Sequence, residues 1–329
     1  MSFDSSRIHW LSTIESTDSL FCSIRRFTGI FSPAWDRYAM GIFLGLLTAL
    51  TWGGADFIAR FATHRIGALR SMLYMQLIGF TLLTISLPVL GGWGHLADGS
   101  GWQPWAWGFL AGFFNALAGL GFYRAFEIGK MSVVAPLSAS YPALTLLLSW
   151  MTGERISGVR IVGIICTLVG VVIVAGGEKT PDENDAEALR RSGRGMGWAI
   201  FAAVGFAILF WLLGIRIIAR VGAIQTVWMI RLTSTLLIAA TILVFKQPVR
   251  LPRSEVRWMV LGMGVFDTGA FVLSNLGMKM EQVAVISVLG SLYGAVTIGL
   301  AAIFLKEHVS RWQWLGIATI FLGIFLIGR

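Results

Sequence analysis

The stretches ERISGVRIVGIICTLVGVV (residues 154–172) and EHVSRWQWLGIATIFLGIF (residues 307–325) decide the fold, because they are two copies of one pattern. Each opens with Glu-x-x-Ser and continues as an apolar run with glycines at corresponding places. One constant shift aligns the copies without a gap, and the positions that it pairs include Ser138 with Ser291, Gly163 with Gly316, and Gly170 with Gly323. Shared hydrophobicity alone would not align charged, hydroxyl and glycine positions together, so the pattern indicates an internal repeat.

The whole chain is more apolar than a soluble protein. Of its 329 residues, 56% are hydrophobic and 13% are charged, whereas a soluble domain carries about 25% charged residues. A membrane helix needs about 20 predominantly apolar residues. Ten runs of this kind are predicted, at residues 41–59, 72–90, 105–126, 132–151, 158–176, 196–215, 222–245, 257–277, 282–305 and 312–328.

A polar segment divides these runs into two sets of five. We expect an extension at residues 1–39, a first repeat at 40–176, a polar linker at 177–195 and a second repeat at 196–329. Because five spans leave the chain on the opposite side of the bilayer, the second copy enters the membrane inverted, as in many secondary transporters. The expected fold is an all-α membrane protein of ten transmembrane helices, built as two inverted-topology five-helix repeats.

The N-terminal extension, the net charge and the two cysteines give no indication of a signal peptide, a nucleic-acid partner or a disulfide framework. Residues 1–39 contain no apolar run that would make a secretory signal. They are either an amphipathic surface segment or a stretch upstream of a true start at Met40, and we favour the second interpretation. The net charge of +9 comes mostly from basic residues between the apolar runs, which favours the lipid bilayer over nucleic acid as partner. Cys22 and Cys166 make no disulfide framework and no metal cluster.

Three features of the first half are typical of one known repeat: Trp52-Gly53, Pro142 with the apolar run to Gly153-Glu154-Arg155, and the glycines of the fifth span. In these residues the sequence resembles the EamA-type repeat of the drug/metabolite transporter superfamily. The second copy departs from the first, with Lys306-Glu307-His308 and Ala295 at the matching places. The resemblance implies a carrier of the inner cell membrane that moves small metabolites such as amino acids, sugars or related solutes without ATP. It fixes neither the substrate nor the oligomeric state, and a monomer is compatible with it.

Two charged residues lie deep inside predicted spans, Arg231 in the seventh and Asp267 in the eighth. A charge at the centre of a membrane helix costs about 2.5–3.5 kcal/mol on insertion scales, so it usually faces a cavity or a partner. Two interpretations stay open. Arg231 binds a substrate carboxylate while Asp267 binds an amine or a proton, or the two residues form a permanent ion pair between adjacent helices.

Asp56 is a third charge in an apolar setting, predicted near the last turn of the first span. It is either an interfacial carboxylate beside an aromatic-belt residue, Trp52, or a protonatable residue at the mouth of a cavity. Gly53 and Gly54 beside it permit close approach of a backbone or a ligand. We lean slightly towards the interfacial interpretation.

Neutral side chains complete the candidate substrate-binding site. Tyr141 precedes Pro142, which removes a helical hydrogen bond and frees a carbonyl, and Tyr293 approximately mirrors Tyr141 in the second copy. Asn275 shares a helix face with Asp267, as Trp228 does with Arg231. The full candidate set is Asp56, Asn115, Tyr123, Tyr141, Trp228, Arg231, Asp267, Asn275 and Tyr293. Structural roles are expected for Glu154 and Glu307 at helix ends, and for Ser157 and Ser310 as N-caps.

The motifs of nucleotide binding and catalysis are missing from the sequence. Residues 121–132 resemble a phosphate-binding loop, but Arg124 and Met131 occupy positions that require glycine and a hydroxyl residue. We therefore expect no enzyme activity, no catalytic residue, no cofactor and no metal. Transport would be coupled to protons or proceed by exchange. The alternative is a non-transporting membrane scaffold or channel-like protein whose buried charges are structural.

Membrane orientation is the point on which two expectations conflict. The family resemblance implies that both termini are cytoplasmic. The basic connectors at residues 60–70 and 246–257 would then face outward, while residues 91–104 contain no Lys or Arg. The positive-inside tendency favours the reverse arrangement. We adopt the family's orientation, because fused inverted halves leave only a weak charge bias.

Overall fold

The computed structural model describes residues 33–90, 92–153, 157–176, 186–249, 253–280, 283–306 and 309–327. Within these ranges every regular element is helical, as the apolar runs predict. The extension up to residue 32, linker residues 177–185 and the two helix-end glutamates, Glu154 and Glu307, lie outside the described residues.

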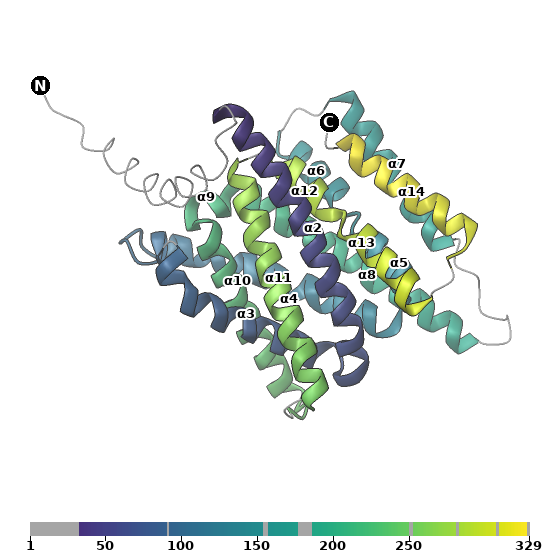
Figure 1. Cartoon of the computed structure of the whole chain (residues 1–329), viewed down its shortest axis with the longest axis horizontal. Helices are drawn as coiled ribbons and strands as arrows, with labels where there is room; N and C mark the ends of the chain where they lie inside the picture. The colour runs from purple at the N-terminus through teal and green to yellow at the C-terminus, as the bar shows by residue number, and fades with distance from the viewer. Residues whose placement is uncertain are drawn as a thin grey trace, which may run out of the picture.

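The helices follow one another with short connectors (Figure 1). The first half contains α2 (Pro33–Ile66), α3 (Ala68–Leu90), the short η2 (Gly94–Leu96), α4 (Gln103–Ile128), α5 (Met131–Ser138), α6 (Tyr141–Met151) and α7 (Gly158–Gly176). The second half contains α8 (Ala186–Leu212), η3 (Leu213–Ile217), α9 (Ile218–Val221), α10 (Ala223–Val244), α11 (Ser254–Met280), α12 (Val283–Ser291), α13 (Tyr293–Leu300), η4 (Ala301–Leu305) and α14 (Arg311–Ile327). The segments η3 and η4 are π-helical.

In the described part of the chain, eight helical spans are long and apolar enough to cross a membrane. Together α5 and α6 make one of them, Met131–Met151, and α12, α13 and η4 supply another, Val285–Leu305. The other two apolar helices, Gly158–Val174 and Arg311–Ile327, are shorter. The all-helical membrane class is confirmed, whereas ten full-length spans are not, because the last helix of each half falls short.

Two boundaries differ from the prediction. Helix α2 continues to Ile66 instead of ending near residue 59. Helix α8 begins at Ala186, so residues 186–195 of the predicted polar linker are helical. That segment opens with Ala, Glu, Leu and Arg, which are strong helix formers, and their polarity hid the helix from a search for apolar runs.

The two halves pack against each other in a reciprocal pattern. The first helix of each half contacts the third helix of the other, so that α2 lies along α11 and α4 lies along α8. The second helices, α3 and α10, contact each other, and so do the last helices, α7 and α14. Figure 1 shows α7 and α14 side by side at one edge of the molecule, next to the main group of helices.

Paired glycines form the contact between α7 and α14. A Cβ atom added at Gly163 would lie 2.8 Å from the carbonyl oxygen of Gly323, and one added at Gly170 would lie 2.8 Å from that of Gly316. Only glycine permits such close approach of two helix backbones. Because the partners follow in reverse order along α14, the two helices are antiparallel, which is the relation that inverted copies require.

The fourth helix of each half is interrupted at the same place. Helix α5 ends at Ser138 and α6 begins at Tyr141, while α12 ends at Ser291 and α13 begins at Tyr293. The predicted disturbance at Tyr141–Pro142 and its mirror at Tyr293 are therefore both present. The predicted cap Ser310 is also confirmed, because its hydroxyl accepts a hydrogen bond from the Gln313 backbone N–H at 3.1 Å.

Candidate functional site

A cavity of about 50 Å³ lies between the two halves, with room for a few water molecules. The first half contributes Trp52, Asp56, Met72, Met75, Gln76, Asn115, Gly119, Phe122, Tyr123 and Tyr141 to its lining, and the second half contributes Phe206, Phe210, Asp267, Phe271 and Tyr293. Six predicted site residues are therefore brought together here, namely Asp56, Asn115, Tyr123, Tyr141, Asp267 and Tyr293.

Arg231 and Asp267 form a buried ion pair at the edge of this cavity. Nη2 of Arg231 lies 2.6 Å from Oδ2 of Asp267, at an angle outside ordinary hydrogen-bond geometry. The Arg231 side chain is completely buried, whereas that of Asp267 is 11% exposed. The pairing that the sequence left open is therefore present, and it leaves Asp267 as the member of the pair that lines the cavity.

The rest of the Arg231 guanidinium is held by residues of α3 and α11. Nη1 donates a hydrogen bond of 2.8 Å to Oε1 of Gln76, and the guanidinium carbon lies 5.0 Å from the ring centroid of Phe271, within cation–π range. Gly79 makes room for the side chain, since a Cβ atom there would lie 2.9 Å from Cδ of Arg231. Arg231 is thus fixed in place on several sides.

Asp56 lines the cavity and is 5% exposed. The interfacial interpretation is wrong, because α2 continues for more than two turns beyond Asp56 and its neighbour Trp52 is buried. Arg60, one turn further along α2, donates hydrogen bonds to the carbonyls of Phe126 and Gly129 at the end of α4. Within the described ranges, no hydrogen bond or ion pair is formed by the Asp56 carboxylate.

Aromatic rings form most of the cavity wall. Trp52 makes edge-on contacts with Phe271, Phe210 and Tyr293, at centroid distances of 5.1, 5.9 and 6.2 Å. Tyr141 stacks on Phe210 at 4.7 Å. These rings come from both halves, so the wall also joins the halves.

The two tyrosines that begin α6 and α13 reach across to the opposite half. The Tyr141 hydroxyl donates a 3.1 Å hydrogen bond to the carbonyl of Ser287 in α12, and the Tyr293 hydroxyl donates one of 3.1 Å to Oγ of Ser138 in α5. Each interrupted helix is therefore tied to its counterpart by the tyrosine at the break.

Asn115 connects the cavity to a chain of hydrogen bonds between α4 and α10. Its Nδ2 donates to Oγ of Ser234 at 3.1 Å, and the Ser234 hydroxyl donates to the Gly112 carbonyl at 3.0 Å. Tyr123 lies about two turns further along α4 and also lines the cavity.

Two predicted site residues lie elsewhere. Trp228 donates its indole N–H to Oγ1 of Thr84 at 2.9 Å and packs against Trp93. Asn275 donates to the Ala223 carbonyl at 3.0 Å and is fully buried. A shared helix face with a charged residue was the reason for including both, but a cavity covers only part of a face, and the hydrogen bonds of these two residues join neighbouring helices.

Several lining residues were outside the predicted set. Gln76 is the most informative of them, because an amide in an apolar run is a detectable signal. Its Oε1 accepts from Arg231, whereas its Nε2 is buried and has no partner among the described residues. The phenylalanines of α8 and α11 gave no such signal, because rings that face lipid and rings that face a cavity are the same residue type.

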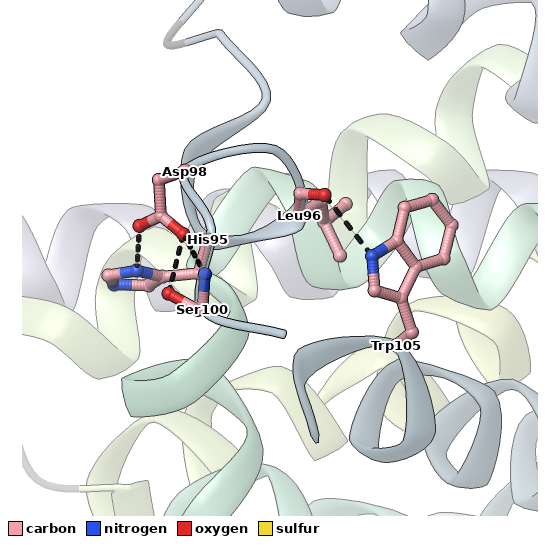
Figure 2. A network of polar contacts seen from close by, with 5 residues as sticks. All are labelled: His95, Leu96, Asp98, Ser100 and Trp105. Carbon is pink, nitrogen blue, oxygen red and sulfur yellow. Dashed lines mark hydrogen bonds and ion pairs between the residues drawn. The ribbon is translucent and has the colours of Figure 1, made fainter. Parts of the chain in front are cut away.

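A separate polar network lies in the connector between α3 and α4 (Figure 2). His95 Nδ1 and Asp98 Oδ2 are 2.7 Å apart, and Trp105 donates its indole N–H to the Leu96 carbonyl at 3.1 Å. Hydrogen bonds from the hydroxyl and backbone N–H of Ser100, with a smaller contribution from His95, lower the pKa of Asp98 to about 2. The network is exposed and contributes no residue to the cavity lining.

Comparisons with known proteins agree with this architecture. A family model described as the EamA-like transporter family matches residues 39–176 and 193–329. Among solved structures, 28 chains match. One, described as the crystal structure of a protein, is 20% identical with a TM-score of 0.65, over 88% of this chain and 96% of that chain. At this identity the likeness concerns the fold alone. The comparison with curated proteins gave no match.

Proposed function

Since the chain belongs to the EamA-like transporter family and is thus a multi-pass membrane transporter, we propose that it carries a small polar metabolite by alternating access. Amino acids, sugars and related solutes are the starting classes. The chain uses no ATP in this proposal, and movement is coupled to protons or to exchange with a second solute. The proposed location is the inner cell membrane.

The observation that carries this proposal is the cavity between the halves, lined by two carboxylates and by polar groups from both repeats. Charged residues inside a membrane protein usually mark a solute or ion pathway. In carriers built from inverted repeats, the substrate site lies near the midplane at the repeat interface. The cavity, with Asp56 and Asp267 in its wall, fits that description.

The size of the cavity supports a mechanism that includes a conformational change. A volume of about 50 Å³ holds a few waters, and a metabolite is several times larger. Admission of a solute therefore requires the halves to separate on one side. Reciprocal packing of α2 on α11 and α4 on α8 provides two equivalent interfaces that would open alternately.

The proposal is tested by counterflow in proteoliposomes. A thermal-shift screen against amino acids, sugars, nucleosides and cationic drugs selects the solute, and labelled solute is then followed into preloaded vesicles. The variant Asp267→Asn should lower the flux at least about tenfold, because it removes a carboxylate of the cavity wall, while membrane insertion stays normal.

The matched control is Asp98→Asn, which changes a carboxylate in the exposed connector and should transport like the parent. Unchanged flux in Asp267→Asn would remove Asp267 from the site.

A scaffold or channel-like role is the second candidate. The observation that favours it is the closed Arg231–Asp267 pair, since a permanent ion pair holds helices together without contacting a solute. A scaffold shows no saturable counterflow for any solute, and a channel shows flux without counterflow. Saturable counterflow by the parent protein would exclude both.

A further inference from the structure

We propose that the cavity selects organic cations, such as a quaternary or protonated amine with a compact apolar body. This inference rests on the transport function proposed above, and it replaces the starting solute classes given there with a single class, organic cations. It is drawn from the charges, the unpaired polar atoms and the rings of the cavity wall.

The charged groups of the wall are both carboxylates, Asp56 and Asp267. The nearby guanidinium of Arg231 is bound to Asp267, Gln76 and the face of Phe271, so it neutralises one carboxylate only. Arg60 donates to carbonyl oxygens at the end of α4, where the helix dipole favours a cation. Asp56 is therefore the carboxyl group of the wall that forms no ion pair with a described residue.

Asp56 is only 5% exposed, and the described residues supply it with no hydrogen bond or ion pair. A buried carboxylate without a partner is unfavourable. A cation in the cavity supplies the missing partner. Gln76 Nε2, which is also buried and unpaired among the described residues, offers a donor to an oxygen atom of the same solute.

The rings provide the second part of the recognition. Trp52 lies one helical turn before Asp56 on α2, so the two share a face, and both line the cavity. Tryptophan is the strongest cation–π partner, and aromatic cages bind quaternary ammonium groups in this way. Phe210, Phe271 and Tyr293 surround Trp52 at centroid distances of 5.1–6.2 Å, which provides an apolar enclosure for the body of the cation.

The same wall disfavours other solute classes. An anion would meet two carboxyl groups in the wall, and the nearby Arg231 forms an ion pair with one of them and does not line the cavity. The carboxylate of a zwitterion would also meet these two carboxyl groups. A sugar needs many hydrogen-bond partners, whereas rings make up most of this wall. Charge and polarity thus both favour a cation with few other polar groups.

The test compares three probes of one shape by isothermal titration calorimetry on the purified full chain. Choline is the cation, 3,3-dimethylbutan-1-ol is its neutral isostere, and 3,3-dimethylbutanoate is a similar anion. We expect choline to bind at least about tenfold more tightly than the alcohol, equivalent to about 1.4 kcal/mol, and the anion not to compete. Asp56→Asn should abolish this preference, and Trp52→Leu should weaken choline binding several-fold.

Asp98→Asn is again the control and should bind choline like the parent, and the unfolding temperature of each variant shows that it is folded. Equal affinity for choline and the alcohol, competition by the anion, or an undiminished preference in Asp56→Asn overturns the inference. If counterflow of another solute depends on Asp267 while choline does not bind, the cation inference fails and the transport function stands. If choline binds as expected but no solute shows counterflow, the binding site stands and the transport function fails.

Discussion

At the scale of single residues, the Arg231–Asp267 pair balances the cost of burying two charges against the attraction between them. Both side chains are removed from water, and each is tolerated because the other is present. A buried ion pair contributes little net stability, but the removal of one member leaves an unpaired buried charge. The pair is therefore sensitive to single substitutions and tolerant of a matched double substitution.

We predict that Arg231→Leu lowers the free energy of unfolding by about 3–5 kcal/mol, because Asp267 then keeps its charge without a partner. The double variant Arg231→Leu with Asp267→Leu should recover most of that loss, since both charges are gone. Thermal unfolding in detergent, followed by loss of monodispersity, measures both. A double variant as unstable as the single one would show that the charges themselves stabilise the fold.

The sequence revealed the charged residues of the site more readily than the aromatic ones. Arg231 and Asp267 stand out because ionised groups are rare in apolar runs, and the structure places them together. Asp56 was equally visible, but its interfacial interpretation was wrong because Trp52 resembles a belt residue. Phe210 and Phe271 were not predicted, because the spacing of rings does not show whether they face lipid or a cavity.

At the scale of elements, the end of α4 is held by a side chain from α2. Arg60 donates to the carbonyls of Phe126 and Gly129, which lie in the last turn of α4 and at its C-cap. Carbonyls at a helix C-terminus lack partners within the helix. This contact links two helices of the cavity wall just beyond Asp56 and Tyr123.

We predict that Arg60→Ala loosens this end of α4. A hydrogen bond from a charged donor is worth about 1.5–3 kcal/mol, so local opening and amide hydrogen exchange near Gly129 should rise about tenfold or more. Exchange measured by mass spectrometry tests this. The control is Arg65→Ala, which removes an exposed pair with Glu255 at 3.4 Å and should change little. Equal exchange in both variants would contradict the role of Arg60.

The glycine contact between α7 and α14 gives a second prediction at this scale. Gly170→Leu should destabilise the protein by at least about 1–3 kcal/mol, because the new side chain meets the backbone of α14. Gly299→Leu in α13 is the control, since a Cβ atom there meets nothing within 4 Å. Thermal unfolding of the two variants measures the difference. A similar loss in both would mean that the contact with α14 is not the cause.

Most helices were predictable from apolar runs, and their ends were not. The start of α8 at Ala186 was missed because the search was for apolar runs, and the first residues of this helix are charged or polar. The interruptions at Tyr141 and Tyr293 were predictable from Pro142 and the repeat. The lengths of α7 and α14 were also predictable, because the runs at residues 158–176 and 312–328 nearly coincide with these helices. The error was to count such short runs as full membrane spans.

At the scale of the whole molecule, basic residues gather at one end of the bundle. The contact between Arg65 and Glu255 joins the last turn of α2 to the first turn of α11, so the two arginine-rich segments at residues 60–70 and 246–257 meet at one end of the bundle. The basic residues counted in these two segments of the sequence therefore belong to one end of the bundle. The positive-inside tendency assigns this end to the cytoplasm, and the family resemblance assigns it to the opposite side.

We predict the family's orientation, with the C-terminus in the cytoplasm. A reporter that functions only in the cytoplasm, fused after Arg329, should be active, and one that functions only after export should be silent. Each fusion is the control for the other, because for either orientation of the C-terminus one of the two reporters should be active. The reverse pattern would show that the basic end, and not family membership, sets the orientation.

The α7–α14 contact has a mechanical consequence. The backbones of α7 and α14 meet at their glycines, and the side chains of Thr167, Val174, Ile320 and Ile327 lie beside that contact. Neither helix supplies a residue to the cavity wall. A displacement of this helix pair therefore need not move the residues that line the cavity.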